Sequence, residues 1–350
     1  MLQRLHLGVL GLLLVLNGCV ISPRRTVGGG SSGGGSGGGV GRIYVSNAAN
    51  NSIVRFDNAL TATGNVTPGA TIVGASTQLS SPQYLFLDVA NNRLFVANQA
   101  GSNVLIFDNA NTKTGNIAPD RTIGGPTTQL ASPVDVALDR TRNFLYVADG
   151  ANIQVFSNAN TTTGDVAPLH SLALGFNASA LFADSGNDRL FVADTTSNAV
   201  HVFDTASTLN NVVTASRIVS GGNTQLNQPA GLQVDNAGRL VVSNFNGPSI
   251  TIYSTAATAN GNLTPVATIS GAGAALGAPT QMVLNNATTT GDLYVADGAA
   301  AGVLIFANIG AANGNLAPTR NINGSNTGLA RSGGGLGAFT AKGIALDTSR

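Results

Sequence analysis

The chain has 350 residues, of which 45 are glycine, 5% are aromatic and 9% are charged, and its formal net charge is +1. Every acidic residue is aspartate, and lysine occurs only at Lys113 and Lys342, so the residues that usually build helix surfaces are nearly missing. This composition excludes a mainly helical protein, and the near-neutral charge argues against a nucleic-acid partner. A hydrophobic fraction of 43%, together with abundant Asn, Thr, Ser and Gly, indicates an all-β fold with a large core.

The N-terminal residues carry the pattern of an export signal. Arg4 precedes an apolar run over residues 7–16, which is too short to cross a bilayer as a helix but suits the core of a signal peptide. The run ends in the letters LNGC, closing on Cys19. This motif resembles the lipobox of bacterial lipoproteins, in which the cysteine is lipidated and becomes the mature N-terminus. We therefore expect residues 1–18 to be a lipoprotein signal peptide; an ordinary secretory signal with an incidental cysteine is the alternative.

The segment after the signal predicts how the protein is held. Cys19 is the only cysteine in the chain, so no disulfide can form within it and the fold must be stabilised by its core alone. Residues 28–41 read GGGSSGGGSGGGVG, a flexible coil with a reach of about 20 Å. We expect residues 19–41 to tether the globular part to a membrane through the lipid on Cys19. Val20, in the place of the Asp that favours inner-membrane retention, favours the outer membrane of the cell envelope.

Residues from Arg42 onward form six copies of one apolar segment. The copies begin at residues 42, 93, 144, 189, 239 and 292, so their spacings are 51, 51, 45, 50 and 53 residues. A period near 50 residues built from short β-type segments predicts the blades of a β-propeller. The copies are Arg42-Ile43-Tyr44-Val45, Arg93-Leu94-Phe95-Val96, Phe144-Leu145-Tyr146-Val147, Arg189-Leu190-Phe191-Val192, Arg239-Leu240-Val241-Val242 and Asp292-Leu293-Tyr294-Val295.

The repeat pattern also predicts how the ring closes. Each unit reads as four strands, of which the first ends in a Leu-Asp-like pair and the second is the apolar segment. The domain begins on a second strand at Arg42 and ends on a first strand over residues 343–347. We therefore expect residues 42–350 to form one six-bladed propeller of four-stranded blades, whose C-terminal strand pairs with the N-terminal blade and removes the open edge.

The blades resemble those of NHL-repeat and related six-bladed propellers. The resemblance rests on the Pro-x-x-aliphatic-x-Leu-Asp first strand at residues 133–139, the Tyr/Phe-Val-Ala-Asp/Asn second strand, and the Asn-Ile-x-Val-Phe third strand at residues 152–156. It implies the fold over residues 42–350. It leaves function open, because such propellers include enzymes, receptors and scaffolds.

No residue pattern in the ring predicts catalysis, a metal or a cofactor. His170 and His201 fall at ordinary repeat positions, and the lactonase-like hydrolases of six-bladed type use a calcium-type site with Glu, which this chain lacks. An Asn or Asp follows every second strand. A ring of cation ligands is one interpretation, but a role in capping a turn that every blade needs is favoured. These residues are Asn47, Asn98, Asp149, Asp194, Asn244 and Asp297.

Departures from the repeat predict where a ligand would bind. Tyr84, Asp135, Gln281 and Lys342 stand near the starts of first strands, where Ala180 and Gly231 occupy other blades. The connection around residues 174–178 is shortened, and the one over residues 324–342 is lengthened and contains Arg331. Structural residues recur in every blade of a repeat protein, whereas a binding site needs different groups in different blades. Drift in unselected loops is the alternative.

We predict a ligand site at the channel mouth that uses five residues. Their mixture of an aromatic ring, an amide and charges of both signs suits a polar ligand such as a glycan, a peptide or a protein segment. The sequence thus favours a non-catalytic binding scaffold at the cell envelope, with a lactonase-like envelope hydrolase as the alternative. The predicted ligand-binding residues are Tyr84, Asp135, Gln281, Arg331 and Lys342.

Overall fold

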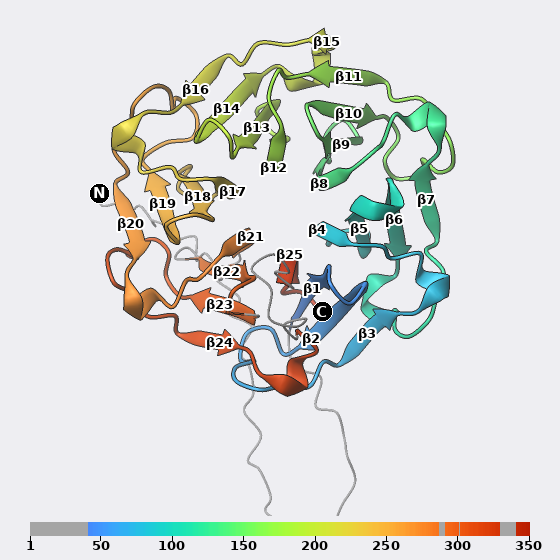
Figure 1. The fold of residues 1–350 in the computed structure, drawn as a ribbon, viewed down its shortest axis with the longest axis horizontal. Helices are drawn as coiled ribbons and strands as arrows, with labels where there is room; N and C mark the ends of the chain where they lie inside the picture. The colour runs from blue at the N-terminus through green and yellow to red at the C-terminus, as the bar shows by residue number, and fades with distance from the viewer. Residues whose placement is uncertain (1–40, 287–290, 301, 330–340) are drawn as a thin grey trace, which may run out of the picture. The chain divides into compact units, whose positions relative to one another are not determined.

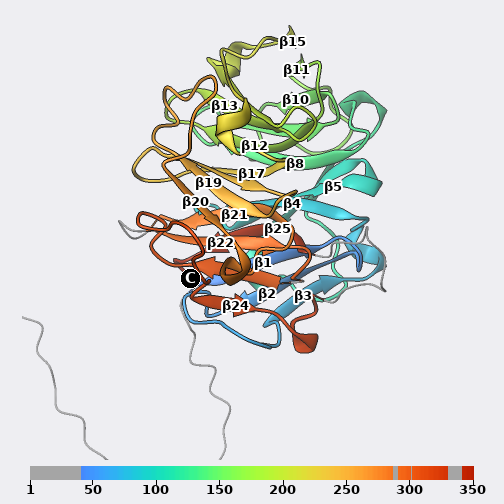
Figure 2. The same ribbon diagram turned by 60° about the vertical axis from the view of Figure 1, so that its left-hand side comes forward.

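The computed structural model describes residues 41–286, 291–300, 302–329 and 341–350. The predictions for the signal peptide, for Cys19, for most of the tether and for Arg331 concern residues outside these ranges. The described residues form six antiparallel sheets arranged around a common centre (Figure 1), and Figure 2 separates successive blades along the ring. The predicted all-β, six-bladed propeller is confirmed. Within the described ranges no helix is long and apolar enough to span a membrane.

Each blade runs from an inner strand at the channel to an outer strand at the rim (Figure 1). From inside to outside, the blades are: β25 (Ala341–Asp347), β1 (Arg42–Asn47), β2 (Ser52–Asp57) and β3 (Ala70–Val73); β4 (Pro82–Asp88), β5 (Arg93–Asn98), β6 (Asn103–Asp108) and β7 (Arg121–Gly124); β8 (Pro133–Asp139), β9 (Phe144–Asp149), β10 (Asn152–Phe156) and β11 (His170–Ala173); β12 (Ala178–Asp184), β13 (Arg189–Asp194), β14 (Ala199–Asp204) and β16 (Arg217–Val219); β17 (Pro229–Val234), β18 (Leu240–Asn244), β19 (Ser249–Tyr253) and β20 (Ala267–Ser270); β21 (Pro279–Asn285), β22 (Asp292–Asp297), β23 (Gly302–Phe306) and β24 (Arg320–Ile322).

The C-terminal strand closes the ring as predicted. β25 pairs antiparallel with β1, with Asp347 opposite Arg42 and Ile344 opposite Val45. The first blade therefore combines the two ends of the propeller, and β1 has no free edge. The hydrophobic cluster at this junction includes Val45 and Ile344 from the closed blade and Tyr294 from the last blade. Burial between neighbouring blades explains why the second strands are apolar at consecutive positions.

Short 3₁₀ helices and one polar turn join neighbouring blades at the rim. Asn116 illustrates the contact: its Oδ1 accepts the backbone N–H of Ser76 at 2.7 Å, at the start of a helix in the preceding blade. Asn65 makes the same contact with the N–H of Asn326, between the first and last blades. The repeated Gly-Asn turn is thus a connection between blades. The helices between blades are η1 (Ala75–Thr77), η4 (Pro126–Thr128), η6 (Gly222–Thr224), η7 (Ala272–Ala274) and η8 (Ser325–Thr327). The other 3₁₀ helices in the described ranges lie within blades and are η2 (Gln99–Gly101), η3 (Ala110–Thr112) and η5 (Ala206–Thr208).

One connection departs from this pattern, as the sequence predicted. Only residues 174–177 join β11 to β12, without a 3₁₀ helix, whereas residues 74–81 join β3 to β4. The turn of the following blade changes with it: β15 (Asn211–Val212) pairs parallel with β11 and adds a fifth strand to that sheet. Phe176 from the short connection stacks on His201, with ring centroids 3.9 Å apart.

Candidate functional site

The inner strands β4, β8, β12, β17, β21 and β25 surround the central channel (Figure 1). Their pairing with the second strands shifts near the start of each strand, and this bulge defines equivalent positions. Numbered from the first residue, the third positions are Tyr84, Asp135, Ala180, Gly231, Gln281 and Gly343. The fifth positions are Phe86, Ala137, Phe182, Gln233, Val283 and Ala345.

The register corrects one sequence alignment. Ile344 lies opposite Val45 just as Leu85 lies opposite Val96, so Gly343, and not Lys342, is equivalent to Tyr84. A Cβ atom on Gly343 would lie only 2.5 Å from the carbonyl oxygen of Gln83, which explains the glycine there. Lys342 stands one residue earlier, at the second position of its strand.

Tyr84 and Gln281 cross the channel. The Tyr84 hydroxyl donates to the carbonyl oxygen of Ala230, on the opposite strand β17, at 2.7 Å. The Gln281 side chain pairs with both backbone groups of Leu85: its Oε1 accepts the N–H at 3.0 Å and its Nε2 donates to the C=O at 2.8 Å. The same Oε1 also accepts the N–H of Ile344 at 2.8 Å. These side chains occupy edge groups that the inner strands leave unpaired.

Asp135 is the third member of this layer. Its side chain is buried, its Oδ1 accepts the N–H of Val136 and its Oδ2 accepts the N–H of Leu181, both at 2.7 Å. Gln281 Nε2 lies 3.5 Å from Oδ1. Burial raises the pKa of this carboxyl to about 8, although the two N–H bonds act in the opposite direction. We call Tyr84, Asp135 and Gln281 together the polar layer.

The polar layer lies between two cavities. The smaller has a volume of about 200 Å³ and is lined by first to third positions, including Tyr84, Ser179 and Lys342. Burial lowers the pKa of Lys342 and raises that of Tyr84. The larger has a volume of about 350 Å³ and is lined mainly by fourth to eighth positions, with Gln281 beside them. The structure thus brings four of the predicted residues into the channel. Tyr84, Asp135 and Gln281 form the polar layer, and Lys342 lines the smaller cavity.

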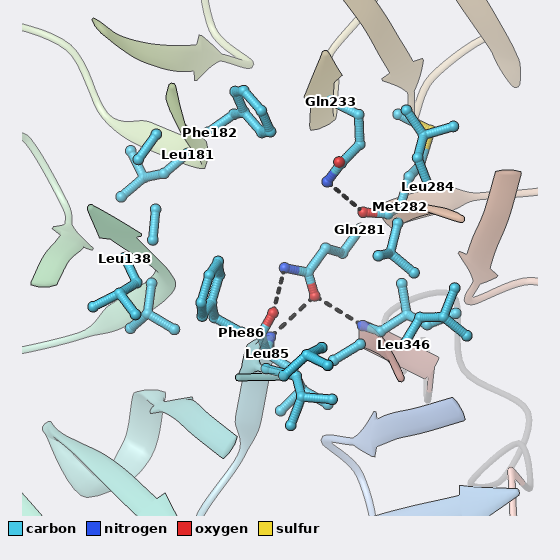
Figure 3. A pocket seen from close by; sticks show the side chains of 18 of the residues that line it. Leu85, Phe86, Leu138, Leu181, Phe182, Gln233, Gln281, Met282, Leu284 and Leu346 are labelled. Carbon is cyan, nitrogen blue, oxygen red and sulfur yellow. Dashed lines mark hydrogen bonds between the residues drawn. The ribbon is translucent and has the colours of Figure 1, made fainter. Parts of the chain in front are cut away.

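Most of the side chains that line the larger cavity are apolar (Figure 3), although polar atoms contribute slightly more of its lining surface than apolar atoms do. Phe86 and Phe182 border it from β4 and β12, and both rings are partly exposed. Gln233 donates its Nε2 to the carbonyl oxygen of Met282, on the next blade, at 2.9 Å. Arg140, just after β8, lies with its guanidinium carbon 5.1 Å from the centre of the Phe86 ring. Arg140 is the sole charged side chain among the described residues that line this cavity.

Sequence reasoning missed this larger cavity, although a signal for it was present. The fifth positions vary between aromatic, amide and small residues just as the third positions do. Gln281 and Asp135 reach from their own strand towards the next blade, and Gln233 does the same from the fifth position. Because side chains two residues apart share one face of a strand, variation at the fifth position also concerns the channel.

The Asn and Asp residues predicted to follow the second strands are the last residues of those strands, and they have structural roles. Asp297 Oδ1 accepts the N–H groups of Ala299 and Ala300, and Asp194 Oδ1 those of Thr196 and Ser197. These contacts agree with the favoured turn-capping interpretation. Asn98 goes further, because its Oδ1 accepts the N–H of Ser80 in the connection that enters the blade. Among the described residues there is no cluster of three or more His, Cys, Asp or Glu side chains suited to a metal ion.

His170 and His201, the two histidines in the described ranges, lie outside the channel cavities. His201, on β14, has its Nε2 3.5 Å from Asp194 Oδ2, and burial lowers its pKa. His170 begins the outer strand β11, at the place where Arg121 begins β7. There the guanidinium of Arg121 donates to the carbonyl oxygens of Ala159 and Thr162 in the next blade. Both histidines therefore occupy structural positions.

Comparison with known proteins identifies the fold. No family model matches the chain, and no curated protein does either. A chain from the crystal structure of a nidogen/laminin complex matches with a TM-score of 0.56 at 12% identity, over 87% of this chain and 98% of that one. A protein of unknown function from Desulfotomaculum acetoxidans matches with a TM-score of 0.50 at 15% identity, over 81% and 79%. A chain of a mitotic checkpoint complex matches with a TM-score of 0.51 at 12% identity, over 82% and 78%. At these identities the likeness shows the propeller fold alone.

Proposed function

We propose that the chain is a non-catalytic binding propeller, anchored by a lipid at a bacterial cell envelope, whose ligand enters the larger channel cavity. The observation that carries the binding role is this cavity of about 350 Å³, bordered by Gln281 of the polar layer and by the partly exposed aromatic residues Phe86 and Phe182. Small-molecule sites are typically concave, mostly apolar and supplied with a few convergent polar groups, within a volume of about 300–1,000 Å³.

The chemistry of the channel supports recognition over catalysis. Asp135 is the one carboxyl group of the polar layer, and both its oxygens already accept backbone N–H groups. It does not line the larger cavity, whose polar side chains are chiefly amides and one guanidinium. Amides and a guanidinium orient a ligand through hydrogen bonds, whereas general acid–base catalysis needs a titratable group within reach of the ligand.

Membrane anchoring rests on the LNGC motif and is tested at Cys19. The wild-type chain is expected in the membrane fraction, because the two or three acyl chains of a mature lipoprotein hold firmly. Cys19→Ala removes the lipid and is expected to shift the protein to the soluble fraction. Ser36→Ala, in the tether, is the matched control and should stay with the membrane. Unchanged partition of Cys19→Ala would end the anchoring proposal.

Binding in the larger cavity is tested by filling it. Ala137 stands at the fifth position, where the blades on either side carry Phe86 and Phe182, so Ala137→Phe is expected to fold and to occupy the cavity. On glycan and peptide arrays, ligands of the wild-type chain should be lost by Ala137→Phe. They should be retained by Val212→Ser, which changes a residue 85% exposed on the rim strand β15.

The same arrays separate the two cavities. If binding survives Ala137→Phe but is lost in Lys342→Ala, the ligand occupies the smaller cavity, on the side of the channel predicted from the sequence. If a folded protein keeps all its ligands in both variants, the channel is not the binding site. Thermal melting of each variant establishes that it is folded.

A further inference from the structure

The polar layer shows which chemical groups fit the channel. The carboxyl group of Asp135 bridges the N–H groups of Val136 and Leu181, on two neighbouring inner strands, with both contacts at 2.7 Å. The primary amide of Gln281 pairs with the N–H and C=O of Leu85 (Figure 3). A carboxylate or an amide therefore satisfies the free edges of the inner strands, as a neighbouring strand would.

The same edges continue into the larger cavity. Backbone groups along an antiparallel strand point alternately to its two neighbours, so residues two further along again face the channel. On β8 and β12 these residues are Leu138 and Ala183, and both line the larger cavity. On β4 the corresponding residue is Leu87, whose carbonyl oxygen accepts a hydrogen bond from Nη2 of Arg140 at 3.4 Å. The larger cavity is therefore lined by strand-edge backbone groups of the same kind as those that Asp135 and Gln281 bind two residues earlier on the inner strands.

Arg140 selects between a carboxylate and an amide. Its Nε lies 3.3 Å from Oδ1 of the buried Asp88, and its described hydrogen bonds use Nε and Nη2, so Nη1 makes none within the described part of the chain. The side chain is 52% exposed and lies over the Phe86 ring. Guanidinium groups bind carboxylates with two parallel hydrogen bonds, so this position favours an anion.

We infer that the larger cavity binds a carboxylate attached to a compact apolar group, with the carboxylate on Arg140 and the strand edges and the apolar group against Phe86 and Phe182. This inference rests on the proposed function and specifies the ligand class of the same cavity. The chemistry is shared by free aromatic or branched-chain acids and by the C-terminal residue of a peptide that ends in such a side chain.

The test uses matched acids and amides with the full-length chain. Isothermal titration compares the affinity of an acid, 3-phenylpropionate, with that of its amide, 3-phenylpropionamide. It also compares two acids, N-acetyl-phenylalanine and the tripeptide Gly-Gly-Phe, of which the second ends as a peptide does. The acid is expected to bind at least about tenfold more tightly than its amide, since a hydrogen bond to a charged group is the interaction that the amide loses. Preference for 3-phenylpropionate indicates a free acid as the ligand, and preference for Gly-Gly-Phe indicates a peptide C-terminus.

Three substitutions, at two positions, assign the roles within the cavity. Arg140→Gln is expected to lower the affinity for the acid to that for the amide and to leave the affinity for the amide unchanged. Arg140→Lys should keep part of the preference for the acid over the amide. Phe182→Leu should weaken both probes. Equal affinity of acid and amide in the wild-type chain overturns the inference about the ligand class. The proposed function is tested separately, by the cavity-filling substitution Ala137→Phe. Absence of binding by any acid at millimolar concentration also overturns it.

Discussion

Deletion of residues 341–350 is expected to unfold the propeller or to leave it aggregating at 25 °C. The deletion removes β25, whose Ile344 and Leu346 are buried in the cluster between the first and last blades. Burial of each such side chain contributes about 1.5–3 kcal/mol, and the lost strand pairing adds about 0.5–1.5 kcal/mol for each hydrogen bond. This sum is comparable with the total stability of a domain, about 5–15 kcal/mol.

Some contacts across the same junction survive the deletion. Asn65 still bonds the N–H of Asn326, and Arg320 still donates to the carbonyl oxygen of Ala59. The truncated chain therefore keeps a joined rim but exposes the inner edge of β1, which promotes pairing with a second chain. Circular dichroism melting and light scattering measure both effects.

Two comparisons make this expectation specific to ring closure. Leu346→Ala leaves the strand in place and should lower the free energy of unfolding by only about 2–5 kcal/mol. Its melting temperature should therefore lie between those of the intact chain and the truncated chain. A synthetic peptide of residues 341–350 added to the truncated chain should raise its melting temperature by restoring the pairing with β1. A truncated chain that melts like the intact one would contradict closure by β25.

The repeat determined how much of the fold could be predicted. Six copies of one apolar segment, with the ends out of phase, were sufficient for the blade number and for the pairing of β25 with β1. Alignment failed by one residue at Lys342 because β25 begins with Ala341, whereas β4 begins with Pro82, and this proline marks the bulge in most blades. Side-chain directions reverse at each residue of a strand, so this error changed the predicted surface.

The candidate site was harder to predict because its polar residues serve the backbone. The mixture of Tyr84, Asp135 and Gln281 was read as a surface for a ligand, and the structure shows their hydrogen bonds to the inner strands. The predicted propeller implies that six strand edges converge on one channel, but no sequence pattern reveals which side chains satisfy the backbone N–H groups there. The larger cavity follows from the same convergence, since Phe86 and Phe182 come from blades that are not adjacent and border one cavity only in the closed ring.

Asp135→Ala is expected to destabilise the propeller by about 2–6 kcal/mol. The substitution leaves the N–H groups of Val136 and Leu181 without the carboxylate, and each unsatisfied buried group costs about 1–3 kcal/mol. Asp135→Asn keeps an acceptor for one N–H group and places an NH₂ group against the other, so its loss should be smaller. Denaturant unfolding of both variants at one pH measures this order, and equal stability of Asp135→Ala and wild type would contradict it.

The carboxyl of Asp135 also makes stability depend on pH. An unfolded chain ionises this group near its usual pKa of 3.8, whereas burial holds the folded pKa at about 8. Between these values the folded state binds more protons than the unfolded state. The contribution of Asp135 to the free energy of unfolding therefore falls as pH rises from about 4 to about 8, by at most about 1.4 kcal/mol per pH unit, and is level above.

Two other buried groups, one of them outside the channel, change stability in the opposite sense. Burial lowers the pKa values of His201 and Lys342, so their folded forms favour loss of the proton and their contributions decrease as pH falls. Asp135→Asn keeps both residues and cannot ionise at position 135. Subtracting its unfolding free energy from that of the wild type at each pH isolates the carboxyl. The unfolding free energy of the wild type, relative to that of Asp135→Asn, should decrease from pH 5 to pH 8. If the two pH curves run parallel, Asp135 is already ionised in the folded channel.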